Sequence, residues 1–296
     1  MKLERRLTLE VGKAAYRNKR RTNLRPNRDI EALRERLKAM EADGHPVDSA
    51  RFELGHEAAD RHLGGLAAHA LHEIHAATTP DATAALGFAL GLARRAAPDR
   101  AMVWGVQAMA GLETGHVHGP GLRELGLDPG RVVLVRVKEM KDLLAAGEEA
   151  LACGAVGAVM LTAWGEAKAM SLTASRRLSM AAAQGRSAAI LVRLAAQPQP
   201  SAAESRWRVK AAPSRPLEAE APGHPTFEIE LLRHRLGAQP RSWIMEWNRE
   251  RGVFQNGGRN GGRNGREERP AVSGGVVSVP ADRSVEAGGG AVRRFG

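Results

Sequence analysis

Short apolar runs alternate with amphipathic stretches along most of the chain. Between about residue 62 and residue 205, five such runs are each followed by a helical pattern or a loop: 70–74, 101–107, 131–137, 155–161 and 188–194. Runs that are apolar throughout and separated by helices are typical of parallel strands buried on both faces. The pattern therefore predicts an α/β fold in which helices flank a mainly parallel sheet.

Helical spacing marks several of the remaining stretches. Residues 139–153 place their apolar side chains on one face of a helix. A second helical stretch contains residues 86–92, and Asp81 is positioned to cap its start. Nearer the N-terminus, residues 28–41 predict a third, amphipathic helix, because apolar side chains recur there with charges between them.

The pattern changes in the C-terminal third. Residues 206–211, 226–234 and 242–247 predict antiparallel strands, and in the second of these apolar residues alternate with acidic ones. The last 42 residues include 11 glycines and too little apolar surface to offset the entropy of ordering, which predicts disorder. The predicted parts are a basic arm (1–27), a helix with a connector (28–61), the α/β core (62–205), a C-terminal strand extension (206–254) and a Gly/Arg-rich tail (255–296).

The chain is basic, and much of the excess lies at its start. It carries 44 basic and 33 acidic residues, a net charge of +11, and residues 1–40 hold 13 of the former and 5 of the latter. Such an excess favours nucleic acid or another polyanion as a partner, while a solvated, disordered arm is the alternative. Aromatic residues make up only 4% of the chain, which argues against a base-stacking surface. The candidate nucleic-acid contacts are Arg17, Lys19, Arg20 and Arg21.

Composition excludes several classes of protein. No apolar run approaches the roughly 18–20 residues that span a bilayer, so no transmembrane segment is predicted. Residues 1–10 lack the apolar stretch of a secretory signal. Cys153 is the only cysteine, which excludes an intrachain disulfide and a Cys-rich zinc module, and a cytoplasmic location is expected. Cys153 itself is predicted to be a small buried hydrophobe at the end of a helix.

Three histidines near the first core strand raise the question of a metal site. His69, His72 and His75 lie close together, with Glu73 between them. The segment is one residue short of the H-E-x-x-H zinc motif and has the pattern of a strand, so His72 and His75 are expected on opposite faces. We therefore predict no metal site.

The first half of the core has the order of elements that carries a phosphate loop. A strand, a loop and a helix follow one another in GGLAAHALHEIHAATTPDATAALGFAL, and a strand, a helix and a strand follow in GRVVLVRVKEMKDLLAAGEEALACGAVGAVML. From about residue 64 to residue 194 the chain thereby resembles the RecA superfamily of ATPase cores. The resemblance implies a RecA-like core with a phosphate loop after its first strand.

The phosphate-loop frame G-x-x-x-x-G-K-[ST] lacks most of its chemistry here. Ala76 and Asp81 stand at the two glycine positions, Ala82 stands at the lysine position, and only Thr83 fits. A phosphate loop works through main-chain N–H groups aimed at the phosphates and through the lysine charge. Pro80 has no N–H, and Asp81 adds a negative charge beside the expected phosphate. Nucleotide binding in the usual manner is therefore expected to fail.

Other functional positions of the RecA-like frame are also vacant. Thr162 stands where the resemblance places the aspartate that holds magnesium, and Gln107 where it places the glutamate that activates water. We therefore predict a pseudo-ATPase with no catalytic residues, no cofactor and no metal. The loops that carry DNA in RecA-type proteins correspond to residues 165–172, whose only cation is Lys168, and 195–205, which have none. Weak nucleic-acid binding is expected there.

Motifs in the C-terminal part narrow the resemblance. The segment SRRLSMAAAQGRSAAILVRL (175–194) comes first. It is followed by RWRV and APS (204–214), and then by LLRHR-x-G and SW-x-x-EW (227–248). In this order they resemble the ImuA family of bacterial damage-inducible mutagenesis proteins, over about residues 28–254. The resemblance implies a non-catalytic accessory subunit of an SOS-induced, error-prone translesion synthesis complex, acting through protein–protein interaction.

The resemblance also implies the partners. These are an ImuB-type inactive bypass polymerase subunit and, indirectly, a DnaE-type polymerase, with RecA and DNA as further candidates. A nucleic-acid-binding module that acts through the basic arm and a divergent ATPase are the alternative functions. Trp and Arg are enriched in interface hot spots, and the alternative for the tryptophans is that they cover the sheet. The predicted partner interface comprises Arg206, Trp207, Arg208, Arg233, Arg235, Trp243 and Trp247.

Overall fold

The computed structural model describes residues 50–218 and 221–257 of the 296-residue chain. The predicted basic arm, the predicted helix at 28–41 and the chain beyond residue 257 lie outside the described residues. So do the candidate nucleic-acid contacts Arg17, Lys19, Arg20 and Arg21.

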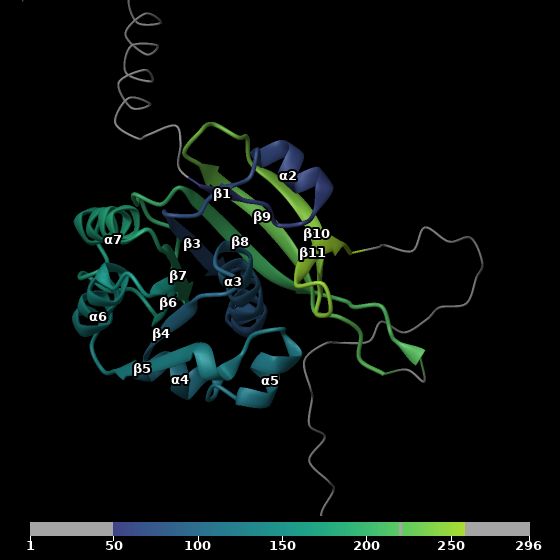
Figure 1. Cartoon of the computed structure of the whole chain (residues 1–296), viewed down its shortest axis with the longest axis horizontal. Coiled ribbons are helices and arrows are strands. Elements are labelled where there is room, and N and C mark those ends of the chain that lie inside the picture. The colour runs from purple at the N-terminus through teal and green to yellow at the C-terminus, as the bar shows by residue number, and fades with distance from the viewer. Residues whose placement is uncertain (1–49, 219–220, 258–296) are drawn as a thin grey trace, which may run out of the picture. The chain divides into compact units, whose positions relative to one another are not determined.

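One nine-stranded sheet forms the centre of the described part of the chain (Figure 1). Its strands lie in the order β11-β10-β9-β8-β3-β7-β6-β4-β5. Neighbours from β8 to β5 are parallel, and neighbours from β8 to β11 are antiparallel. The predicted fold class is therefore confirmed. The strands are β3 (Leu71–Ala76), β4 (Ala101–Gln107), β5 (Val132–Val137), β6 (Val156–Trp164), β7 (Ala188–Leu194), β8 (Ser205–Ala212), β9 (Thr226–His234), β10 (Arg241–Asn248) and β11 (Val253–Asn256).

Strand β8 joins the two halves of the sheet. It pairs in parallel with β3 on one side and antiparallel with β9 on the other, so the C-terminal strands continue the core sheet. The sequence pattern predicted these strands without showing where they join. A second, two-stranded sheet is formed by β1 (Arg51–Phe52) and β2 (Leu66–Ala67).

Helices cover both faces of the parallel half. α3 (Ala82–Ala96) packs on one face, while α6 (Met140–Ala152) and α7 (Leu172–Gly185) pack on the other. In Figure 1, α6 and α7 lie to the left of β6 and β7, and α3 lies to their right. The shorter elements are α2 (Glu57–Leu63), α4 (Ala108–Thr114), α5 (Gly119–Glu124) and the 3-10 turns Thr79–Asp81 and Pro129–Arg131.

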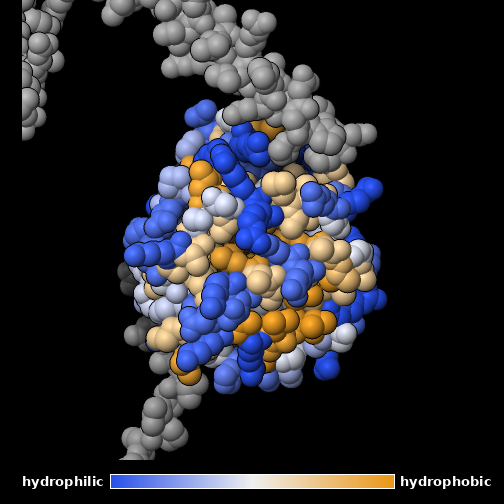
Figure 2. Space-filling view, turned by 90° about the vertical axis from the view of Figure 1, so that its left-hand side faces the viewer, coloured by the Kyte–Doolittle hydropathy of each residue, from blue (hydrophilic) through white to orange (hydrophobic). Residues whose placement is uncertain are grey.

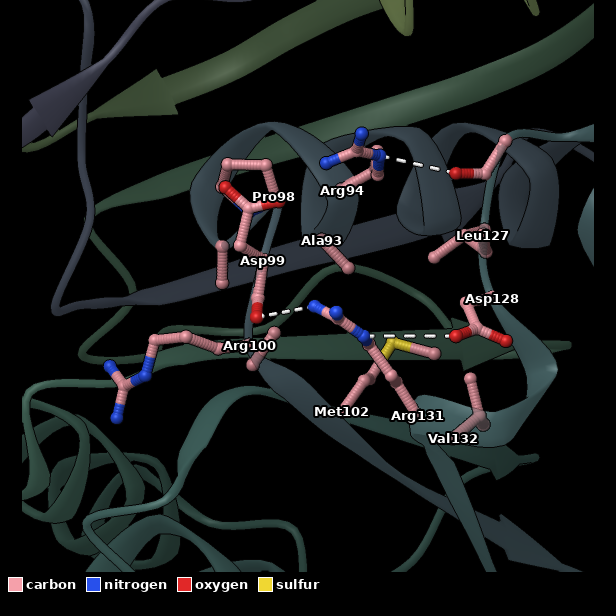
Figure 3. Close-up of a pocket in the computed structure, with 13 residues that line it drawn as sticks. Ala93, Arg94, Pro98, Asp99, Arg100, Met102, Leu127, Asp128, Arg131 and Val132 are labelled. Carbon is pink, nitrogen blue, oxygen red and sulfur yellow. Dashed lines mark hydrogen bonds and ion pairs between the residues drawn. The ribbon is translucent and has the colours of Figure 1, made fainter.

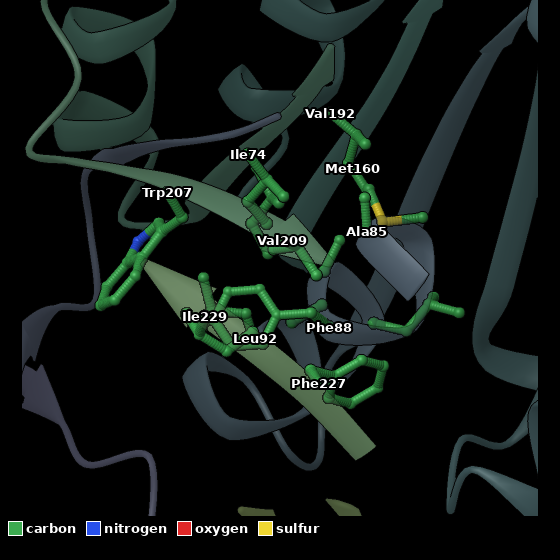
Figure 4. Packing of buried hydrophobic residues seen from close by; sticks show 14 of the residues in the cluster. Ile74, Ala85, Phe88, Leu92, Met160, Val192, Trp207, Val209, Phe227 and Ile229 are labelled. Carbon is green, nitrogen blue, oxygen red and sulfur yellow. The ribbon is translucent and has the colours of Figure 1, made fainter. Parts of the chain in front are cut away.

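Phe88 of α3 lies at the centre of the larger apolar cluster. The centroid of its ring is 5.8 Å from that of Trp207, 6.3 Å from that of Phe227 and 5.1 Å from that of Phe254. All four side chains are almost completely buried. Figure 4 shows Phe88 and Leu92 of α3 packed against the side chains of β8 and β9. These contacts fix α3, and with it the loop before α3, against the antiparallel half of the sheet.

Two glycines permit close approach between elements. A Cβ atom on Gly91 of α3 would lie 2.5 Å from the ring of Phe254. A Cβ atom on Gly185, at the end of α7, would lie 1.7 Å from the carbonyl oxygen of Leu151 in α6. Both distances are far inside van der Waals contact, so neither position accepts a larger residue without movement of its neighbours.

The structure corrects two details of the sequence interpretation. Cys153 is exposed, because it follows α6 beyond Leu151, the last buried residue of that helix. β11 includes Gln255 and Asn256, which composition had assigned to the tail, and it is anchored by the fully buried ring of Phe254. No helix among the described residues combines the length and the apolar character needed to cross a membrane.

Candidate functional site

The loop between β3 and α3 is the segment on which the sequence places the phosphate-loop frame. β3 ends at Ala76, and a short connection with the 3-10 turn Thr79–Asp81 leads directly into α3 at Ala82. The predicted order of strand, loop and helix is therefore confirmed. Pro80 and Thr83 are exposed, whereas Ala82 is buried.

Asp81 is 7% exposed, and its carboxylate accepts hydrogen bonds from this loop and from the neighbouring strand. Its Oδ2 accepts hydrogen bonds from the main-chain N–H of Thr78 (3.0 Å) and from the Thr78 hydroxyl (2.6 Å). Its Oδ1 accepts from the N–H of Ala211 on β8 (2.9 Å). The N–H of Ala77 donates to the carbonyl oxygen of Val209, also on β8 (2.8 Å). The loop is thus hydrogen-bonded to the strand beside it.

Several main-chain N–H groups of this loop are engaged within the protein. The N–H groups of Ala77, Thr78, Asp81 and Ala82 all donate to protein oxygens, and Pro80 has none to offer. A phosphate bound here would also be repelled by the negative charge of the buried Asp81 carboxylate. One of the positions at which the sequence lacks a phosphate-loop residue thus carries a buried carboxylate. This carboxylate accepts hydrogen bonds from Thr78 of the same loop.

The prediction that Asp81 caps α3 with its side chain is wrong. Asp81 does precede the helix, but its side chain makes no capping hydrogen bond to α3. Its backbone (φ −81°, ψ 3°) continues the 3-10 turn instead of adopting the extended conformation usual for a cap. The carboxylate therefore reaches back to Thr78 and across to Ala211.

Thr162 and Gln107, the other two positions that the resemblance matched to an ATPase site, form hydrogen bonds between strands. Thr162 lies within β6, two residues before the strand ends at Trp164, whereas the predicted apolar run ends at residue 161. It is 1% exposed, and its hydroxyl oxygen accepts a hydrogen bond from Nε1 of Trp104 (2.9 Å). Gln107 ends β4, and its Oε1 accepts from the N–H of Trp164 (2.9 Å). Both neutral side chains link β4 to β6.

A buried group of charged side chains spans β3, β7 and β8 on the face of the sheet that carries α7. Glu73 and Arg193 are 1% and 2% exposed. Nε of Arg206 donates to Glu73 Oε2 (2.9 Å), and Nη1 of Arg193 lies 3.8 Å from Glu73 Oε1. The hydroxyl of Ser201 donates to Glu73 Oε2 (2.6 Å), and Nε2 of His75 is 3.4 Å from Oε1.

This environment keeps Glu73 ionised. Burial raises the pKa of Glu73, but hydrogen bonds from His75 and Ser201 and the charges of His75 and Arg206 outweigh that effect and lower the pKa to about 2. Arg206 was predicted to contact a partner. Its side chain is instead 11% exposed and held inward by Glu73 and Ser201. The physical reason is that a buried carboxylate requires a charged partner.

Glu166 joins residues 165–172 and 195–205, the two segments for which the resemblance suggests the DNA loops of RecA-type proteins. Its Oε1 accepts from the N–H of Gln197 (2.6 Å). Its Oε2 accepts from Nε2 of Gln199 (2.9 Å) and from Nη2 of Arg193 (3.3 Å). Lys168 is exposed nearby in sequence. The connection therefore places a carboxylate between loops that carry little positive charge.

His72 belongs to a buried chain of hydrogen bonds. Nε1 of Trp207 donates to the Ser205 hydroxyl (2.7 Å), which lies 2.7 Å from Nδ1 of His72, and Nε2 of His72 lies 2.9 Å from the carbonyl oxygen of Ala67. A neutral ring with its proton on Nε2 satisfies all three contacts. Burial lowers the pKa of His72 to about 4, although the Ala67 hydrogen bond opposes this and the charges of His234 and Arg51 add to it. His72 is therefore neutral at neutral pH.

The prediction that His72 and His75 lie on opposite faces of their strand is confirmed. His72 contacts Phe52 and Ser205, whereas His75 faces Glu73 on the opposite side of β3. Within residues 50–218 and 221–257, no group of three or more His, Cys, Asp or Glu side chains is arranged to hold a metal ion.

The predicted partner interface is corrected at its three tryptophans. Trp207, Trp243 and Trp247 are 0%, 7% and 1% exposed and belong to the apolar cluster around Phe88. Side chains so deeply buried have no surface to offer a partner. Of the remaining predicted contacts, Arg208 is partly exposed and paired with Glu230 (2.7 Å), and Arg233 and Arg235 are exposed.

A small hollow of about 210 Å³ lies at the amino ends of β4 and β5 (Figure 3). Its arginines are engaged locally: Nε of Arg94 donates to the carbonyl oxygen of Gly126 (3.1 Å), and Nη1 of Arg131 donates to that of Asp99 (2.6 Å). The phosphate-loop position is at the carboxyl end of β3. The hollow is therefore on the opposite end of the sheet from the expected nucleotide site.

Sequence reasoning missed the cluster around Glu73. The available signal was Arg193, a single charge in an otherwise apolar strand, because a buried charge must be paired. Its partners, Glu73 and Glu166, lie on other elements far away in the sequence, so only the tertiary structure identifies them.

Comparison with known proteins gives the family. Two relatives, each named Protein ImuA, from Caulobacter vibrioides strains NA1000 / CB15N and ATCC 19089 / CIP 103742 / CB 15, are 32% identical to the chain over 198 residues. The alignment covers 62% of this chain and 77% of each relative.

The chain belongs to the ImuA family. The resemblance stated from the C-terminal motifs is thereby confirmed. No family model matches the chain. In this ImuA family member, the loop after β3 is hydrogen-bonded to β8 through Ala77 and Asp81.

Proposed function

We propose that this ImuA family protein is a non-catalytic, RecA-like accessory subunit of a damage-inducible, error-prone translesion synthesis system. It would act in the cytoplasm through protein–protein interaction, with an ImuB-type subunit as its direct partner and a DnaE-type polymerase reached indirectly. Family membership supports the role in damage-inducible mutagenesis. RecA is a further candidate partner because a related core fold offers matching surfaces.

One observation carries the non-catalytic part of the proposal. The carboxylate of Asp81 binds Thr78 and Ala211, and the N–H of Ala77 is bonded to Val209. In a working phosphate loop, main-chain N–H groups of the loop point at phosphate oxygens. Here they hold the loop against β8. The same segment that would bind nucleotide therefore contributes to the stability of the fold.

A nucleic-acid-binding role through the basic arm is the second candidate function. It is favoured by the 13 basic and 5 acidic residues within residues 1–40. Binding through such an arm depends on phosphate contacts and weakens steeply with salt, whereas docking through apolar surface does not.

The proposal is tested by nucleotide titration of the full chain. We expect isothermal titration calorimetry to show no saturable binding of MgATP or MgADP up to about 1 mM, the upper end of the usual range of enzyme KM values. The same result is expected after addition of a purified ImuB-type subunit, which should itself bind the chain. Tight, magnesium-dependent binding of ATP in either case would contradict the non-catalytic role.

A double variant tests whether the loop itself accounts for the expected absence of nucleotide binding. Asp81→Gly combined with Ala82→Lys restores a glycine and the lysine of the phosphate-loop frame. Measurable nucleotide binding by this variant, with none by the wild-type chain, would assign the loss of binding to these two positions.

A further inference from the structure

The two edges of the nine-stranded sheet differ in how they are protected. β11 has only four residues, and the N–H of Phe254 donates to the carbonyl oxygen of Leu54 (3.0 Å), so a neighbouring segment covers that edge. β5 has six residues and, in the sheet that the structure describes, pairs with β4 alone. An edge strand presents a row of unpaired N–H and C=O groups, to which another strand can be added. β5 is the edge open to addition.

The side chains of β5 are unusually apolar for an open edge. The strand reads Val-Val-Leu-Val-Arg-Val, and Val133 is 56% exposed. Val132, Leu134 and Val137 are only partly buried against the two apolar clusters. Figure 2 views the molecule from the side on which β5 lies in Figure 1 and shows apolar side chains gathered low on this face, at the height of β5. Natural edge strands are usually shorter or more highly charged.

The positive charge of β5 limits the kind of strand that can be added to this edge. Arg136 is the one charged residue within β5; it is exposed, and no ion pair joins it to a carboxylate of the described residues. Lys138, directly after the strand, is also exposed. β5 itself contains no Asp or Glu, so a second copy of β5 paired with the first would offer Arg136 no opposite charge. A strand with an acidic residue opposite Arg136 would do so.

We propose that the β5 edge binds an extended segment of a partner protein as an added strand. The segment places apolar side chains beside Val133 and Val135 and a carboxylate beside Arg136, which lies on the other face. This inference rests on the proposed function, since it assigns a surface to the partner-binding role. A six-residue strand buries less surface than a standard stable interface, so this contact acts as one part of a larger or transient association.

Three single variants of the full chain test the proposal. Arg136→Glu reverses the charge, and Val133→Glu places a carboxylate among the apolar side chains. The matched control is Met180→Glu, since Met180 is an equally exposed apolar residue (61%) on α7, away from the edge. Binding to a purified ImuB-type subunit is measured by biolayer interferometry, and melting temperatures within a few degrees of wild type establish that the variants are folded.

We expect Arg136→Glu to weaken binding about fivefold and Val133→Glu about tenfold or more, while Met180→Glu binds like wild type. Hydrogen exchange of the β5 amides should slow in the wild-type complex, which a purely structural role of β5 would not produce. Wild-type binding by both edge variants, with unchanged β5 exchange, would overturn the inference and leave the proposed function intact.

Two further outcomes count against the proposal in other ways. If the wild-type chain does not bind the ImuB-type subunit, the proposed function fails and the inference fails with it. If light scattering shows a dimer that Val133→Glu converts to a monomer, the edge is occupied by a second copy of the chain, and the assignment to a partner strand is overturned.

Discussion

Asp81 shows how a single residue can change what a loop does. At this position a phosphate loop has glycine, whose N–H points at the ligand. Here the side chain instead accepts three hydrogen bonds, two from Thr78 and one from Ala211. Because the carboxylate is 7% exposed, its hydrogen bonds are little weakened by competition with water. The loop is therefore held to β8 by its own side-chain and main-chain groups.

Replacing Asp81 by Asn should destabilise the fold. The amide retains one acceptor oxygen and replaces the other by a donor, so either Thr78 or the N–H of Ala211 loses its partner. We expect a loss of about 1–3 kcal/mol in the free energy of unfolding, measured by urea denaturation. The exposed Glu149→Ala on α6 is the control and should change stability by less than about 0.5 kcal/mol. Equal effects of the two substitutions would show that the Asp81 hydrogen bonds contribute nothing to stability.

At the scale of elements, the position of α7 depends on a backbone contact with α6. Gly185 ends α7 where the carbonyl oxygen of Leu151 in α6 approaches, and a Cβ atom would lie 1.7 Å from that oxygen. Main-chain atoms cannot move aside as the end of a flexible side chain can. The two helices are therefore able to pack at this distance only while the residue is glycine.

Gly185→Ala should force α6 and α7 apart and destabilise the chain by about 3 kcal/mol or more. Gly154, in the turn after α6, has no atom within 4 Å of a Cβ position, so Gly154→Ala should be nearly neutral. Thermal unfolding followed by circular dichroism distinguishes the two. A Gly185→Ala chain as stable as Gly154→Ala would mean that α7 adjusts without cost.

At the scale of the whole molecule, the sheet joins a conventional α/β half to an antiparallel half through β8. The shared apolar cluster around Phe88 runs across this junction, so the two halves share one core. Buried polar groups lie at the same junction, among them His72 and Glu73 on adjacent positions of β3. Their ionisation is consequently coupled to unfolding of the fold as a whole.

Stability should fall as the pH is lowered. The pKa of His72 is about 4 in the folded chain and near 6.5 when unfolded, so below about pH 6.5 the unfolded chain binds more protons. The contribution of His72, about 3 kcal/mol, is present above pH 6.5 and is lost as the pH falls to about 4. Burial and the charges of Arg51 and His62 also lower the pKa of His234 to about 4, and its contribution is lost in the same direction. Glu73 follows between about pH 4.5 and 2.

We expect the melting temperature to fall between pH 6.5 and pH 4.5, as followed by calorimetry. His72→Gln should lower stability at pH 7 but make its pH dependence clearly shallower in this range, because one of the histidines whose pKa is lowered in the folded chain is gone. The same slope in wild type and variant would contradict the assignment of the pH dependence to His72.

Much about this protein follows from its sequence alone. The order of strands and helices, the vacant phosphate-loop positions and the family were all predicted, because they depend on local periodicity, on residue types at fixed spacing and on motifs. The structure and the comparisons then confirmed the fold class and the family.

Only the tertiary structure decided what each side chain contacts. The sequence predicted that Asp81 is a poor neighbour for phosphate, but its bond to Ala211 depends on β8 lying beside β3, which local periodicity does not determine. The interface prediction for Trp207 failed for the same reason, because a strand pattern shows which side chains share a face and not which face another element covers. The pairing of Glu73 with Arg193 and the open edge at β5 likewise arise from the order of strands in the sheet, which contacts distant in sequence establish.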